Sequence, residues 1–416
     1  MFAVNRPSST VAPPIKLLTQ PLPMVRRFPP AMIRKPLWIL GSLLAFGASA
    51  QNAFADAGTP LMWATMLHLV VGNAIIGVGE GLVLAKLFSL KKLKTVVVLI
   101  AANYFSAWGG GWFLESAIVR HLHMDLNNAW TWFWVLVAAT YLMTLVIEWP
   151  FVAFCLRGKD GWLRKSLMGN LVIQTLSYVL LFGWYWMASG SSLYTKMQIV
   201  PAGELSLPES VLVYFISEKD GNVYAGNFSN IKSHQIFELN STNENDRLFV
   251  KSSSTRTNYW DLMARIEIDN NRDPKLVEIK NGLAKEAVSD WRADQNPPKY
   301  EGTWFSFGNV PRLGSAGKSD WEFETGFWPI EGLRGTSNLK NLHVHFSFET
   351  PFGAWNVRNA TQLSGDDVLF QLGQNQICIF NPNTKRVSLL TYGRGPVAII
   401  PEITNEPISK PDLPKK

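Results

Sequence analysis

Four long apolar segments constrain this chain more than any other feature of its sequence. They cover about 61–88, 95–117, 130–156 and 166–188, and each is long enough to cross a hydrocarbon layer as a helix. Inside a bilayer the backbone polar groups have to be satisfied within each helix. The sequence therefore predicts a four-helix transmembrane domain over residues 61–188.

The distribution of charge supports this interpretation. The formal net charge is +7, but residues 190–416 hold 24 Lys and Arg against 26 Asp and Glu. The excess of positive charge lies in the first 189 residues, beside the apolar segments. Such clusters are typical of membrane topology signals and not of a phosphate-binding face, so we expect the lipid bilayer, and not nucleic acid, as a partner.

The connections between the segments predict an orientation. The loops at 86–94 and 157–165 each carry four basic residues, whereas the middle connection carries only Arg120. The positive-inside rule places the two basic loops in the cytoplasm. The middle loop and the C-terminal domain are then expected on the extracytoplasmic side of a bacterial inner membrane.

A leader sequence precedes the first segment. Residues 32–55 contain a basic start, an apolar core over 37–47 and small residues typical of a cleavage site, which together predict a signal peptide. An ordinary short helix is the alternative. Residues 1–31 are rich in proline and show no periodicity, so we expect them to be disordered or to lie upstream of a true start at Met32.

The two helical hairpins share a polar pattern. Glu80 precedes Asn103 by 23 residues, and Glu148 precedes Asn170 by 22, which predicts an internal repeat with each glutamate bonded to the asparagine of its own hairpin. His68 adds a further polar position. These residues could form a proton or ion relay or a polar substrate pocket, or they could only orient the helices. The structural role is the favoured interpretation.

The rest of the chain changes character. Residues 193–402 contain short β-rich runs separated by turn residues, which predicts an extracytoplasmic, mostly-β domain. A helical insert is expected at about 274–294. Residues 403–416 have the composition of a disordered tail.

One segment of this domain carries a resemblance. Residues 366–401 read as three strands joined by a glycine turn and an Asn-Pro-Asn-Thr-Lys turn. The segment resembles one blade of a bacterial β-propeller of the NHL/YVTN kind, carried by Asn381, Pro382, Thr384, Lys385, Gly393, Gly395 and Pro396. This resemblance implies a propeller-like domain, with an irregular β-sandwich as the alternative. The overall layout is also similar to bacterial inner-membrane proteins with four helices and an outer β domain, a resemblance that implies no activity.

Histidines and tryptophans provide the remaining candidate sites. His121 and His123, and His343 and His345, are spaced two apart and are candidate metal ligands. Solvated surface positions are the alternative for both pairs. Trp304, Trp321, Trp328 and Trp355 are candidates for a binding surface, with core packing as the alternative.

The sequence lacks the common nucleotide-binding and hydrolase motifs. We therefore expect no cofactor and favour a protein without catalytic activity, with an enzyme as the open alternative. The first functional hypothesis is a membrane-anchored β domain that binds or senses a protein, glycan or other envelope component. The second is a small transporter or membrane-embedded enzyme that uses Glu80 and Glu148, and a homo-oligomer stays open. A metal-dependent extracytoplasmic hydrolase is a third.

Overall fold

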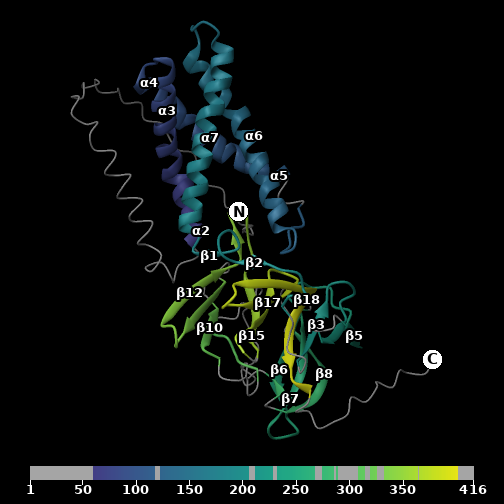
Figure 1. Cartoon of the computed structure of the whole chain (residues 1–416). Helices are drawn as coiled ribbons and strands as arrows, with labels where there is room; N and C mark the ends of the chain where they lie inside the picture. Colours follow the sequence, from purple (N-terminus) through teal and green to yellow (C-terminus); the bar gives the residue numbers. More distant parts are fainter. Residues whose placement is uncertain are drawn as a thin grey trace, which may run out of the picture. The chain divides into compact units, whose positions relative to one another are not determined.

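The computed structural model describes most of the two predicted domains (Figure 1). The described residues are 60–117, 122–205, 211–227, 232–267, 274–284, 287–288, 308–313, 319–325, 332–363 and 365–401. The predicted signal peptide, the segment before it and the predicted C-terminal tail therefore lie outside the described residues.

Four long apolar helices form the first part of the described chain. They span Ala64–Phe88, Lys92–Leu114, Ala129–Leu156 and Trp162–Ala188, which confirms the four predicted segments to within a few residues. The first two helices each contain one turn of π-helix and continue through it. The helical elements are α2 (Pro60–Leu67), η3 (His68–Gly72), α3 (Asn73–Phe88), α4 (Lys92–Phe105), η4 (Ser106–Gly110), α5 (Gly111–Ala117), α6 (Ala129–Leu156) and α7 (Trp162–Ala188).

The helices pack so that each touches two others. α3 lies against α4 and α7, and α6 lies against α4 and α7. Exchange of the two hairpins, α3–α4 for α6–α7, therefore leaves the pattern of contacts unchanged. This is the arrangement that an internal repeat of two helical hairpins would produce.

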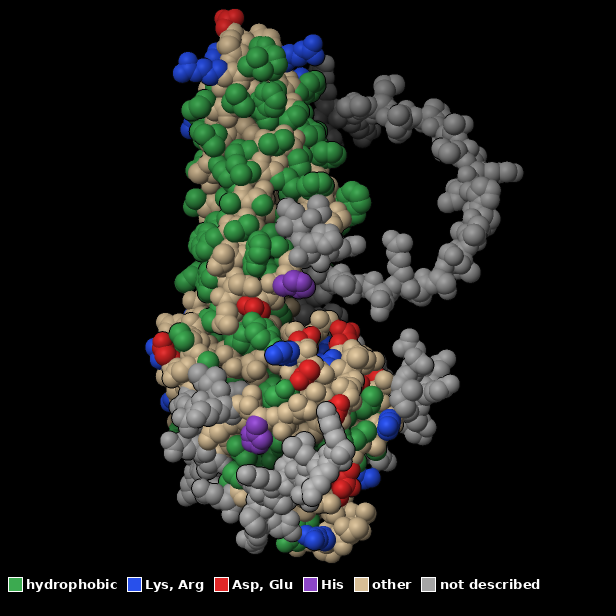
Figure 2. Space-filling view, turned by 90° about the vertical axis from the view of Figure 1, so that its right-hand side faces the viewer, with side chains coloured by type: hydrophobic (Ala, Val, Ile, Leu, Met, Phe, Trp, Pro, Cys, Tyr) green, Lys and Arg blue, Asp and Glu red, His purple; other side chains and the backbone are tan. Residues whose placement is uncertain are grey.

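Apolar side chains cover the outside of the helices (Figure 2). Val146 and Leu180 are 72% and 71% exposed, although both are strongly apolar. The buried face of α7 is instead largely polar, because Ser166, Asn170 and Gln174 are all buried. A domain with an apolar surface and polar residues inside is suited to lipid and not to water, in agreement with membrane-spanning helices.

Small residues allow α3 and α4 to approach closely. A Cβ atom on Gly77 would lie 2.6 Å from the Cα atom of Ile100, and one on Gly81 would lie 2.6 Å from the Cα atom of Val96. Ala85, one further turn along, is also buried. A small residue at every fourth position is a typical close-packing face between membrane helices.

Strands make up the C-terminal part, as predicted. Their order in the sheets is β1-β12-β11-β10-β9, β13-β14, β15-β16-β17-β18-β3-β4-β5 with β2 beside β18, and β6-β7-β8. The strands are β1 (Ser191–Ser192), β2 (Gln198–Ile199), β3 (Leu212–Ser217), β4 (Val223–Asn227), β5 (Lys232–Phe237), β6 (Arg247–Ser252), β7 (Tyr259–Ile266), β8 (Lys275–Ala284), β9 (Gly308–Asn309), β10 (Trp321–Thr325), β11 (Leu333–Ser337), β12 (Leu342–Ser347), β13 (Glu349–Thr350), β14 (Gly353–Ala354), β15 (Val357–Gln362), β16 (Val368–Leu372), β17 (Gln376–Asn381) and β18 (Arg386–Ile399).

The segment that resembles a propeller blade has the predicted strands but a different setting. β16, β17 and β18 form antiparallel pairs across the predicted turns. β18 is 14 residues long, and its second half pairs with β3. The strands thus belong to one large open sheet, and no propeller or closed barrel is found among the residues that the structure describes.

The prediction of a helical insert at about 274–294 is wrong for residues 275–284. Lys275–Ala284 forms strand β8, which pairs with β7. Leu276, Ile279 and Leu283 have helical spacing, which is why the sequence favoured a helix. Gly282 adopts a left-handed backbone conformation, with φ of +72°, which most other residues avoid. The open edge of β7 gives this segment a ladder of backbone hydrogen bonds, which decides the outcome.

The loop before α6 is part of the β domain core. Leu126 is fully buried in the same apolar cluster as Phe346, Phe370 and Phe380. Its backbone N–H donates to Gln376 Oε1 at 2.6 Å. The middle loop of the helical domain and the C-terminal strands therefore share one core.

Candidate functional site

The two membrane glutamates occupy equivalent positions in their helices. Glu80 lies eight residues before the end of α3 at Phe88, and Glu148 lies eight residues before the end of α6 at Leu156. At 1.5 Å per residue, both lie about 12 Å inside the same end of the helical domain. Their exposed fractions are 4% and 0%.

Glu80 accepts hydrogen bonds from two other helices. Asn103 Nδ2, on α4, donates to Glu80 Oε2 at 2.6 Å. Ser177 Oγ, on α7, donates to Glu80 Oε1 at 2.5 Å. The bond between Glu80 and Asn103 is the one predicted from the sequence, and the serine from the other hairpin was not foreseen.

Glu148 is bonded in the same manner but not by the predicted residue. Gln174 Nε2, on α7, donates to Glu148 Oε2 at 2.6 Å. Ser106 Oγ, the first residue of η4, donates to Glu148 Oε1 at 2.5 Å. Asn170 instead donates to the carbonyl oxygen of Leu145 at 2.8 Å. The predicted pair of Glu148 with Asn170 is therefore wrong, since the amide one turn further along α7 reaches the carboxyl.

The two sets of contacts are related by exchange of the hairpins. Each glutamate takes an amide donor from its own hairpin and a hydroxyl from the other. Asn103 and Ser106 are three residues apart on the second span, and Gln174 and Ser177 are three residues apart on the fourth. Residues at i and i+3 share a helix face, so each of these helices serves both carboxyls at once. We call these six residues the carboxyl network: Glu80, Asn103, Ser106, Glu148, Gln174 and Ser177.

The donor types of the carboxyl network have a chemical consequence. A side-chain amide N–H₂ can only donate, whereas a hydroxyl can either donate or accept. An ionised carboxyl accepts from both partners. A protonated carboxyl can still accept from the amide and can donate its own proton to the hydroxyl, which then accepts. Each site can therefore satisfy both protonation states of its glutamate without moving a helix.

Among the residues that the structure describes, no basic side chain balances the two carboxyls. Within the described part of the chain, neither Glu80 nor Glu148 forms an ion pair. Their four hydrogen-bond donors are all neutral. A fixed negative charge at this depth is expensive, so a partner cation or a proton is required to neutralise it.

Further polar contacts occur near both ends of α7. Toward one end, His68 Nδ1 and Tyr185 Oη are 2.7 Å apart. Toward the other end, Trp149 Nε1 donates to Ser166 Oγ at 3.0 Å. Ser166 and Tyr185 are separated by about 28 Å along the helix, close to the ~30 Å thickness of a hydrocarbon core. Polar side chains thus occur along nearly the whole length of α7.

Both π-helical turns carry residues of these polar contacts. η3 begins at His68, and η4 begins at Ser106, which donates to Glu148. Single π turns inside α-helices are often found at functional sites, because they shift the register of the side chains beyond them. The π turn of the second span thus begins at a residue of the carboxyl network.

Of the tryptophan candidates, the structure describes Trp321 and Trp355. Trp321 is 2% exposed and stacks on Phe323 with ring centroids 5.9 Å apart. Trp355 packs partly buried against the same apolar cluster. Trp304 and Trp328 lie outside the described residues. Trp321 therefore packs in the core, which was the alternative to a role in a binding surface.

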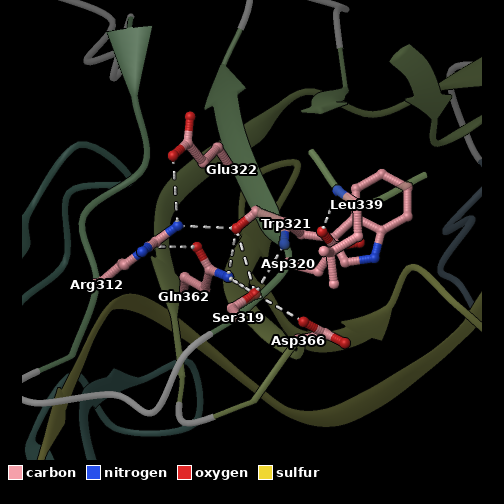
Figure 3. A network of polar contacts seen from close by, with 8 residues as sticks. All are labelled: Arg312, Ser319, Asp320, Trp321, Glu322, Leu339, Gln362 and Asp366. Carbon is pink, nitrogen blue, oxygen red and sulfur yellow. Dashed lines mark hydrogen bonds and ion pairs between the residues drawn. The ribbon is translucent and has the colours of Figure 1, made fainter. Parts of the chain in front are cut away.

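A polar network fixes Trp321 in place (Figure 3). Arg312 Nη2 donates to the carbonyl oxygen of Trp321 at 3.1 Å. Gln362 Nε2 donates to Ser319 Oγ at 2.7 Å, and Ser319 Oγ donates to Asp366 Oδ1 at 2.6 Å. These bonds join segments around β10 to β15 and β16, so we interpret this network as a structural connection.

The structure describes three of the four histidine candidates, His123, His343 and His345. His343 is exposed, and its Nδ1 lies 3.1 Å from Thr336 Oγ1. His345, on the same face of β12, pairs across the strands with Arg334. Burial, together with the charge of Arg334, lowers the pKa of His345 to about 4. No group of three or more metal-ligating side chains occurs among the described residues, and His121 lies outside them while His123 is exposed.

Comparisons with known proteins add no assignment to this geometry. No protein-family model matches the chain, and a search of curated proteins found no match. The carboxyl network therefore has to be interpreted from its own chemistry.

Proposed function

We propose that the helical domain conducts protons across the membrane and that Glu80 and Glu148 take up and release them. One observation carries this proposal. Each carboxyl lies between an amide that can only donate and a hydroxyl that can reverse its hydrogen bond. This arrangement supports a group that changes its protonation state while its surroundings stay fixed.

A purely structural role would not require carboxyl groups. Glutamine could join the same helices, with its oxygen toward the amide and its Nε2 toward the serine. It would avoid the cost of an ionisable group at this depth, which is about 2.5–3.5 kcal/mol for Asp, Lys or Arg at mid-span on insertion scales. Two glutamates at equivalent depth therefore favour a role in which ionisation matters.

The polar residues of α7 extend the proposed path toward both surfaces. The pair of His68 and Tyr185 lies toward one end, and Asn170 and Ser166 lie toward the other. Asn170 Oδ1 is buried and has no hydrogen-bond partner among the described residues, so it could accept a bond from a passing donor. A homo-oligomer could complete the path, since four spans enclose little volume by themselves.

Proton flux into liposomes tests this proposal. The full-length protein would be reconstituted with a pH-sensitive dye inside the vesicles, and a potassium diffusion potential would drive protons inward. We expect flux for the wild type and a rate no higher than that of protein-free liposomes for Glu80→Gln and for Glu148→Gln. Glutamine keeps the hydrogen bonds of the carboxyl network, so the thermal stability of both variants should stay close to that of the wild type.

Asn73→Ala provides the matched control. Asn73 is also buried in α3, but its Nδ2 donates only to the carbonyl oxygen of Leu69 in the same helix. This variant should lose some stability and keep its flux. Two results would rule out the proposed path. One is the absence of proton flux in liposomes that contain the wild-type protein, and the other is wild-type flux in either glutamine variant.

For the C-terminal part, we propose an exported β domain on the extracytoplasmic face of a bacterial inner membrane. It would bind an envelope component and regulate the helices. The basic loops support this orientation. The burial of Leu126 in the β core supports regulation, because this residue lies in the loop that leads into α6. A membrane-impermeant maleimide should label Lys219→Cys in intact spheroplasts and label Lys159→Cys only after lysis. The reverse pattern would overturn this orientation.

A further inference from the structure

One end of the helical domain carries a concentration of positive charge. The loops Lys86–Lys94 and Arg157–Lys165 each contain four Lys and Arg residues, and Asp160 is the only acidic residue in either loop. Figure 2 shows basic side chains gathered at one end of the helices, with an acidic side chain beside them. All eight are exposed.

These positive charges are not neutralised within the described part of the chain. No ion pair links any of the eight to an acidic side chain there. Lys94 instead places its Nζ 4.6 Å from the centre of the Phe154 ring, at the end of α6. This contact also brings the two loops together, because Lys94 belongs to the first loop and α6 leads into the second.

The helix ends at this surface also favour an anion. α4 and α7 both begin here, and neither has a side-chain cap or an acidic residue in its first turn. Lys92 and Lys94 occupy the first turn of α4, where the helix dipole favours negative and disfavours positive charge. An anion from outside the chain would relieve this repulsion and could accept hydrogen bonds from the backbone N–H groups of the first helical turns.

The surroundings of the basic residues indicate the source of the anion. Apolar residues adjacent to them face outward: Leu87, Leu93 and Leu167 are 54%, 79% and 55% exposed. A bound group would thus meet positive charge at the rim of the helices and apolar side chains directly beside it. A phospholipid has this combination in one molecule, whereas free phosphate or an acidic soluble protein does not.

We propose that this basic end of the helical domain is a binding surface for anionic phospholipids, with headgroup phosphates held by the two loops and acyl chains lying along the adjacent leucines. The inference does not depend on proton conduction by the carboxyl network. Each Lys or Arg near an anionic membrane surface adds to the attraction, so several of them together give a clear preference over zwitterionic lipid.

Lipid retention by the full-length protein tests the proposal. The protein would be purified from mixed micelles with equal phosphatidylglycerol and phosphatidylcholine, and native mass spectrometry would count the lipids that remain bound. We expect phosphatidylglycerol to be enriched on the wild type. The triple variant Lys91→Gln, Lys92→Gln and Lys165→Gln should lose this enrichment by about tenfold or more.

A second triple variant removes the same charge elsewhere. Lys219→Gln, Lys251→Gln and Lys275→Gln alter exposed lysines of the β domain, so this variant should retain phosphatidylglycerol like the wild type. Thermal unfolding of both variants shows whether they are folded. Equal retention of the two lipids by the wild type, or equal loss of enrichment in both triple variants, would overturn the proposal.

Discussion

At the scale of the residue, His345 shows what burial does to a side chain that seemed available for binding. It lies on the face of β12 opposite Phe346, beside Arg334. Its Nε2 atom is buried and has no hydrogen-bond partner within the described residues. Because both burial and the neighbouring positive charge disfavour the imidazolium, the pKa of His345 falls from its usual 6.5 to about 4.

This shift predicts a loss of stability in acid. The unfolded chain binds a proton at His345 below pH 6.5, and the folded protein does so only near pH 4, so unfolding takes up a proton between these values. The free energy of unfolding should therefore fall as the pH decreases from 6.5 to 4, by on the order of 2–3 kcal/mol. Thermal unfolding across this range should show a weaker pH dependence for His345→Gln.

His343→Gln is the matched control for this measurement, since His343 is exposed on the same strand. Its pH dependence should follow that of the wild type. If His345→Gln also followed the wild type throughout this range, the loss of stability would belong to other groups.

The same scale shows what could be predicted about the carboxyl network. Glu80, Glu148 and Asn103 were identified because a carboxyl or amide within an apolar segment is conspicuous. Ser106, Gln174 and Ser177 were not assigned as partners, because a serine in a membrane helix often bonds only its own backbone. The choice between Asn170 and Gln174 depends on which helix turn meets Glu148, and the sequence does not contain this information.

At the scale of the element, the packing of α3 on α4 depends on Gly77 and Gly81. Added Cβ atoms at these positions would collide with backbone atoms of α4, which cannot move away as a side-chain tip can. The two helices also hold Glu80 and Asn103 in hydrogen-bond contact. Close packing and the geometry of the carboxyl network are thus linked.

Alanine substitutions along α3 test this packing. Gly81→Ala should lower the free energy of unfolding by about 1–3 kcal/mol, because the added methyl group overfills the interface. Gly79→Ala is the internal control, since the added carbon meets no other helix or side chain within 4 Å, and it should be neutral or slightly stabilising. Thermal unfolding in detergent gives the comparison. Equal stabilities of the two variants would contradict the packing described for α3 and α4.

Predictability also differs between kinds of element. The four spans were predicted almost to their ends, because a bilayer requires a long apolar helix and little else resembles one. The hairpin of β3 and β4 contains Asp220-Gly221 between its strands, a dipeptide that is itself a local signal for a hairpin turn. β8 was mistaken for a helix, since its short apolar pattern fits both periods. The pairing of β18 with β3 joins residues about 180 positions apart, and local patterns do not report such contacts.

At the scale of the whole molecule, the helical and β parts are connected through the loop before α6. Tyr392 Oη donates to Asp125 Oδ2 at 2.7 Å, and this bond raises the pKa of Tyr392 to about 12. Phe133, near the start of α6, packs against Tyr194 with ring centroids 5.4 Å apart. The C-terminal part is therefore in direct contact with the start of α6, the helix that carries Glu148.

Infrared spectroscopy of the full-length protein in a lipid bilayer tests the central claim most directly, because protonated and ionised carboxyl groups absorb at different frequencies. We predict that a pH titration of the wild type shows a protonated-carboxyl band that the double variant Glu80→Gln and Glu148→Gln lacks and that Asn73→Ala retains. Identical titration spectra for the wild type and the double variant would show that the two glutamates never change protonation state, which would contradict the account.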